Sequence, residues 1–183
     1  IDWICDMPFS LKPVFIGYEI STSLLRDYDL SSNILGVGLK SHPNDPWMLN
    51  NRAYVNARIN KLDEAEKDME QLEHCNKALS ESMSICKEAT HGLIAYRRKD
   101  REKGRKLYEQ AILRASTMKE NSEEIKVKAQ INMLREEIIF SNYQNTSALM
   151  ELEQLVIPNE KLELVKLRNE VFDEMKKNEK NQG

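Results

Sequence analysis

The histidines and cysteines are the residues of this sequence best suited to catalysis or metal binding, and their spacing favours neither. Cys86 precedes His91 by five residues, a rotation of about 500° along a helix, so the two side chains do not share a face as an i, i+4 pair would. His74 adjoins Cys75, and His42 lies in a proline-rich turn without a cysteine or carboxylate pattern around it. Such residues are more typical of structural or surface positions than of a zinc site or a Cys–His nucleophile. We therefore predict that the protein is not an enzyme and holds no cofactor or metal ion.

Charged residues give a second set of candidates. Basic side chains gather at residues 97–99 and 101, where they could hold an acidic peptide or a phosphate, but Asp100 and Glu102 beside them are typical of a solvated turn. Glu136 and Glu137 are expected on an ordinary solvated helix face. The net charge of −3 gives no general attraction to nucleic acid or to acidic membranes, and we predict neither partner. No apolar run approaches the roughly 20 residues of a membrane span.

A pattern of small and large residues recurs along the chain and indicates repeated pairs of helices. In each clear copy a small residue lies twelve positions before another, and a large apolar residue follows four positions later: Ala53, Ala65 and Met69 in one copy, Gly92, Gly104 and Tyr108 in the next. The second members of the two copies are 39 residues apart. A weaker copy, with Tyr28, Ser31, Leu35 and Gly38, lies 34 residues upstream of the first.

Residues 12–118 resemble three tetratricopeptide repeats, whose period is 34 residues. The resemblance is carried by Asn51-Arg52-Ala53 in the first helix of a pair and by the alanine-containing second helix, and the longer interval is that period with five residues inserted. Glu19 departs from the pattern, because a small residue is usual there. The resemblance implies an all-α, right-handed solenoid of antiparallel helical hairpins. Asn51 alone matches the positions with which some members grip acidic chaperone tails, so that activity is not implied.

We predict a single domain over residues 1–183. A lead-in (1–11) precedes three repeats (12–45, 46–79 and 85–118), a degenerate fourth hairpin (122–157) and a capping helix (159–178). The candidate helix N-caps are Ser10, Asp45, Ser80 or Ser82, and Asp100. The four small residues Ala53, Ala65, Gly92 and Gly104 are expected where paired helix axes approach to about 8 Å.

The first helices of such hairpins line a concave groove, which is the expected binding surface. The candidate partner-binding residues are Trp47, Asn50, Asn51, Tyr54, Arg58, Leu93, Tyr96 and Arg97, with Ile20, Leu24 and Gln130 as further members. Tryptophan, tyrosine and arginine are typical of interface hot spots, and asparagine is a poor helix former that needs a polar partner. The alternative is that Trp47 and Tyr54 pack between repeats.

The predicted function is a cytoplasmic, non-enzymatic scaffold for protein binding, in which a preorganised groove holds a peptide or protein. Three alternatives stay open. The chain could be a regulatory or targeting part of a larger protein with a catalytic domain elsewhere, as the start at Ile1 suggests. It could self-associate as a homo-oligomer, or bind RNA with steep salt dependence. In the groove model, Tyr54→Ala with Arg58→Ala abolishes partner capture and leaves thermal unfolding nearly unchanged.

Overall fold

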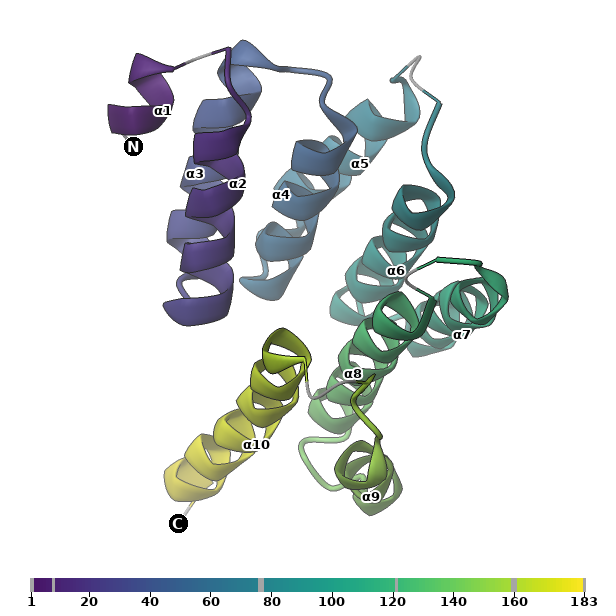
Figure 1. Cartoon of the computed structure of the whole chain (residues 1–183). Coiled ribbons are helices and arrows are strands. Elements are labelled where there is room, and N and C mark those ends of the chain that lie inside the picture. The colour runs from purple at the N-terminus through teal and green to yellow at the C-terminus, as the bar shows by residue number, and fades with distance from the viewer. Residues whose placement is uncertain (1, 8, 76–77, 121, 159–160, 183) are drawn as a thin grey trace.

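The computed structural model describes residues 2–7, 9–75, 78–120, 122–158 and 161–182, and all regular structure in these residues is helical (Figure 1). The all-α class predicted from the sequence is confirmed. In chain order the elements are α1 (Asp2–Asp6), α2 (Lys12–Glu19), the π-helix η1 (Ile20–Leu24), α3 (Tyr28–Ser41), α4 (Pro46–Arg58), α5 (Leu62–Glu73), α6 (Glu81–Arg97), α7 (Arg101–Thr117), α8 (Ser122–Phe140), α9 (Thr146–Gln154) and α10 (Leu162–Gln182). No described helix combines the length and the apolar character that crossing a bilayer would need.

Side-chain N-caps mark the starts of several of these helices. The side chains of Asp45, Ser80 and Asp100 accept hydrogen bonds from backbone N–H groups three residues later, at 2.9, 3.2 and 3.1 Å. These N-cap predictions are confirmed, and Pro46 occupies the first turn of α4, where its missing N–H has no consequence. The prediction for Ser10 is wrong. The N-cap of α2 is Leu11, whose backbone is already helical and whose side chain makes no capping bond.

The small residues lie where paired helices touch, as predicted. Ala53 and Ala65 are completely buried between α4 and α5. A Cβ added to Gly104 would lie 2.5 Å from Cδ2 of Tyr96 and 3.0 Å from the carbonyl oxygen of Gly92. The backbones of α6 and α7 therefore approach too closely for any side chain at this position.

The first pair of helices makes its close contact through serines. In η1 the hydroxyls of Ser21 and Thr22 both donate to the carbonyl oxygen of Tyr18, at 3.0 and 2.7 Å, and such bonds compete with the regular α-helical pattern. Ser21 then faces Ser31 of α3, with 2.8 Å between the hydroxyl oxygens. Glu19 is exposed. A π-helical turn adds a residue that hydrophobic periodicity does not reveal, so the repeat spacing does not carry over unchanged into this pair.

The helices from α2 to α9 form a row in which each packs against the next, and α4 also packs on α6 and α6 on α8 (Figure 1). A hydrophobic cluster from α1 through α8 and a second cluster from α8, α9 and α10 form most of the core. The last helix was expected to close the open end. α10 covers apolar residues of α8 and α9, and it also reaches back to η1 near the start of the chain (Figure 1).

Candidate interaction surface

Polar side chains connect α2, α4 and α8 on one side of the row. We call this side the inner face and define it by Tyr18, Asn51, Tyr54, Arg58 and Asn132. The Tyr18 hydroxyl donates to Oδ1 of Asn51 at 3.0 Å, and the Tyr54 hydroxyl donates to Oδ1 of Asn132 at 3.2 Å. Arg58 donates from Nη1 to the Tyr54 hydroxyl at 2.8 Å. Helices far apart in sequence are thus held in one register by side chains that face inward.

A cavity of about 90 Å³ lies against this network. Its lining joins the polar residues Asn50, Asn51, Thr90, Lys128 and Asn132 to an apolar wall that includes Ile85, Ala89, Tyr108, Ile125 and Ala129. The Asn50 side chain is 5% exposed, and its Oδ1 has no hydrogen-bond partner in the described part of the chain. A buried acceptor without a partner costs about 1–3 kcal/mol. The cavity therefore has room for a short apolar group and is lined by a residue whose buried acceptor lacks a donor.

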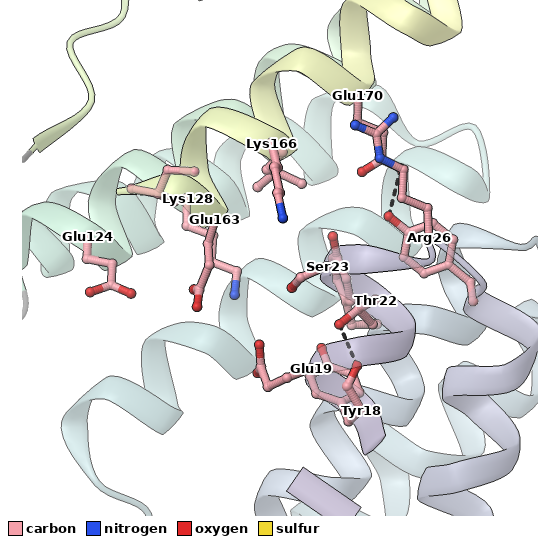
Figure 2. Close-up of a pocket in the computed structure, with 14 residues that line it drawn as sticks. Tyr18, Glu19, Thr22, Ser23, Arg26, Glu124, Lys128, Glu163, Lys166 and Glu170 are labelled. Carbon is pink, nitrogen blue, oxygen red and sulfur yellow. Dashed lines mark hydrogen bonds between the residues drawn. The ribbon is translucent and has the colours of Figure 1, made fainter. Parts of the chain in front are cut away.

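A second pocket, of about 70 Å³, lies between η1, α8 and α10. In Figure 2, Glu163 and Lys166 extend from α10 toward Glu19 and Ser23 on the opposite side. Although Glu19 is exposed, the neighbouring helices remove part of the water around its carboxylate and so raise its pKa. The charge of Glu163 raises this pKa further, and Lys128 opposes the change. This pocket is polar and carries both signs of charge.

Arg58 was predicted to lie on the free surface of the groove, and that prediction is wrong. Arg58 instead joins α4 to α10. Its side chain is 1% exposed, and Nη2 lies 2.6 Å from Oε1 of Glu170. The Tyr28 hydroxyl donates to the same oxygen at 2.7 Å, and the Arg58 guanidinium lies 4.4 Å from the centroid of the Tyr28 ring. Burial raises the pKa of Tyr28, which keeps its hydroxyl a donor. Removing Arg58 would leave Glu170 buried without its cation, so the expectation of unchanged unfolding for Tyr54→Ala with Arg58→Ala does not fit this geometry.

Four further predicted residues are engaged inside the protein. The Trp47 ring makes edge contacts with Phe15 and Tyr18, at centroid distances of 4.3 and 5.2 Å. Leu93 and Tyr96 were expected on an open groove, but they are 1% and 3% exposed. They point into the core because α6 is covered by α4, α7 and α8 together. Arg97 pairs with Glu136, with 2.7 Å between Nε and Oε2.

The contribution of α8 and α10 to the buried ion pairs was not predicted from the sequence. Glu136 and Glu137 were expected in solvent, but they are 3% and 5% exposed. Tyr96 donates to Glu137 at 2.6 Å, and Arg101 donates to it at 2.7 Å. The sequence signal that could have indicated this is a pair of adjacent carboxylates between the apolar residues Leu134 and Ile138. Of the further members of the predicted set, Ile20 and Leu24 are exposed on η1, and Gln130 is half-buried on α8.

Cys86 and His91 show no activation for catalysis. Burial raises the pKa of the Cys86 thiol and lowers the pKa of His91, whose Nε2 lies 3.3 Å from Glu73. A thiol with a raised pKa is a poor nucleophile. Cys75 is also unbridged, and the Cys5 side chain lies outside the described residues. In the part of the chain that the structure describes, no three histidine, cysteine or carboxylate groups gather as metal ligands would.

The basic cluster predicted at the turn between α6 and α7 contacts acids of the same chain. Arg98 bonds to Asp63 and to Glu66 of α5, the latter at 2.6 Å, and Arg101 bonds to Glu137 of α8. These cations join neighbouring helices, and the inner face is the remaining candidate site.

No protein-family model, curated protein or solved structure matches the chain.

Proposed function

We propose that the chain is a right-handed α-solenoid of tetratricopeptide-like hairpins that acts as a non-enzymatic interaction module. Its inner face binds an extended segment of a peptide or protein partner. The partner's backbone meets the asparagines of α4, and one short apolar side chain enters the cavity beside Asn50. The protein in this proposal holds its partner and carries out no chemistry on it.

The turns within the helix pairs support the repeat assignment. Arg26, Asn60 and Lys99 all have positive φ angles, and they are separated by 34 and 39 residues, the two intervals between the sequence copies. After Asn60 and Lys99, the next N–H bonds to a carbonyl five residues back, at 2.9 Å in both cases, as in a Schellman motif. After Arg26 the bond spans one residue more, from Asp27 to Ser21, and η1 accounts for the extra residue.

The observation that carries the binding proposal is the unpartnered Oδ1 of Asn50 beside the cavity. An extended peptide offers an N–H donor at each residue other than proline, and a short aliphatic side chain suits a space of about 90 Å³. The neighbouring bonds between Tyr18 and Asn51 and between Tyr54 and Asn132 hold the rim in place before a partner arrives. Such preorganisation lowers the entropy lost on binding.

A random peptide library selected on the native protein provides the test, with affinities then measured by titration calorimetry. Asn50→Leu should weaken the selected peptides about tenfold, since it removes the acceptor and fills the cavity. The same substitution should leave the free energy of unfolding unchanged or higher, because an unpartnered acceptor is lost.

Asn33→Leu is the matched control, because Asn33 is exposed on α3 and does not line this cavity. It should leave peptide affinity unaltered. The proposal fails if selection yields no binding peptide, or if Asn50→Leu binds the selected peptides as tightly as the native protein does.

A further inference from the structure

The two sides of α10 contact the rest of the molecule in different ways. Leu164 and Val171 are buried in a hydrophobic cluster with residues of α8 and α9. On another side, α10 presents Glu170, Asp173 and Glu174, which we call the carboxylate edge. This edge lies against cations from three other segments of the chain. The apolar contact packs α10 on α8 and α9, and the charged contact joins α10 to the start of α3, to α4 and to α8.

Three arginines receive the carboxylate edge, and we call them the arginine site: Arg26 between η1 and α3, Arg58 at the end of α4, and Arg135 on α8. Arg26 lies 2.9 Å from Asp173, and Arg58 lies 2.6 Å from Glu170. Arg135 makes two bonds to Glu174, at 2.9 and 3.1 Å. Figure 2 shows Arg26 and Glu170 on the same side of the pocket below α10.

Two members of the arginine site are buried, whereas Arg26 and its partner Asp173 lie at the edge of the site and are partly exposed. The side chains of Arg58 and Arg135 are 1% and 6% exposed. The Arg58 guanidinium lies over the Tyr28 ring, and its Nε has no partner among the described residues. Buried cations of this kind are stable only with an anion beside them. A helix can supply several anions on one side when its acids are spaced as in the carboxylate edge, at positions i, i+3 and i+4.

We propose that the arginine site is a docking surface for an acidic helix of a partner protein, and that α10 is the chain's own occupant of that surface. This inference rests on the proposed function, since it adds a partner class and a form of regulation to the inner face. When the partner's helix displaces α10, its carboxylates take the place of those of α10, so no arginine is left unpaired. Because α10 is part of the same chain, it competes at a high effective concentration. A partner therefore binds the native protein weakly until α10 is displaced.

The test uses the full chain and a fluorescein-labelled peptide of residues 162–178, which carries the carboxylate edge. Binding is followed by fluorescence anisotropy with the native protein and with Glu170→Gln/Asp173→Asn/Glu174→Gln, in which α10 no longer neutralises the arginines. We expect at least about tenfold tighter binding to the triple variant, because the amide side chains of its α10 compete less well for the arginines than carboxylates do. Adding Arg26→Gln to the triple variant should weaken the peptide again.

A peptide with the same three acids replaced by amides is the matched control and should not bind. Circular dichroism checks that the triple variant is folded. If it is not, Asp173→Lys provides the same test, because the Asp173 side chain is half exposed and its reversal places a cation beside Arg26. Tighter peptide binding to Asp173→Lys than to the native protein supports the proposal.

Three outcomes would overturn it: no binding to either folded variant, equal binding of the amidated peptide, or a dimer of the native chain that Glu170→Gln dissolves. The last would assign the arginine site to a second copy of this protein. Peptides selected through the Asn50 cavity would still bind in the first two cases, so failure here is distinguishable from failure of the proposed function.

Discussion

Neighbouring atoms decide where this protein needs glycine. Gly104 and Gly36 both lie inside helices, where glycine costs roughly 1 kcal/mol relative to alanine. A Cβ on Gly104 would meet the Tyr96 ring and the Gly92 carbonyl oxygen, whereas the nearest atom to a Cβ on Gly36 would be Arg52 Nη1, at 3.6 Å. Although both glycines lie in helices, the neighbouring atoms exclude a side chain at Gly104 and leave room for one at Gly36.

Gly104→Ala should lower the free energy of unfolding by about 1–3 kcal/mol, because the added methyl group forces α6 and α7 apart. Gly36→Ala is the control and should be neutral or stabilising, since the contact is ordinary and helix propensity improves. Urea denaturation of both variants gives the comparison. Equal effects would mean that the close approach of α6 and α7 does not determine the glycine.

At the scale of elements, α8 is the helix that joins the two halves of the row. Its apolar residues pack toward α9 and α10, and its carboxylates Glu136 and Glu137 lie against the turn that joins α6 to α7. Charges can be buried here because each has an arginine within 2.7 Å. A helix covered on several sides has no single apolar stripe. Hydrophobic periodicity therefore did not show which residues of α8 are buried.

The pairing of Glu137 makes stability depend on pH. Burial alone raises the pKa of Glu137, but the hydrogen bonds from Arg101 and Tyr96 outweigh it and hold the pKa below the ordinary value. The stabilisation is therefore present above about pH 4.3, the ordinary value for glutamate. It is lost as the pH falls through the lower pKa of the folded state.

Between about pH 7 and about pH 3, the native protein should lose more unfolding free energy than Glu137→Gln does. Glu109→Gln, at a half-exposed carboxylate of α7, should keep the pH dependence of the native protein. Chemical denaturation at several pH values measures all three. If Glu137→Gln and the native protein have parallel pH profiles, the Glu137 carboxylate is not the titrating group.

At the scale of the whole molecule, α10 connects the end of the chain to its beginning. The bond between Arg58 and Glu170 spans 112 residues, and Arg26 and Tyr28 extend the same contact to the first helix pair. In a simple row of helix pairs each unit contacts only its neighbours. Here the return of α10 makes the two ends of the row energetically dependent on each other.

Arg58→Met should destabilise the protein by about 3–5 kcal/mol, because Glu170 stays buried without its cation. The double variant Arg58→Met/Glu170→Gln should recover much of that loss, since neither charge remains. A double-mutant cycle in urea measures the coupling, with Arg26→Gln/Asp173→Asn as a half-exposed pair whose removal should matter little. Additive effects of the two buried substitutions would show that Arg58 and Glu170 do not act as a pair.

The sequence by itself determined most of the helices, the N-caps Asp45, Ser80 and Asp100, and the contacts at Ala53, Ala65, Gly92 and Gly104. These features depend on residues within a turn or a hairpin of each other, and their physical causes are local. Only the tertiary structure decided that η1 shifts the first helix pair, that Arg58, Leu93 and Tyr96 are buried, and that α10 returns to the inner face. The environment of a charged or aromatic side chain is set by whichever distant segment lies against it, and no local pattern carries that information.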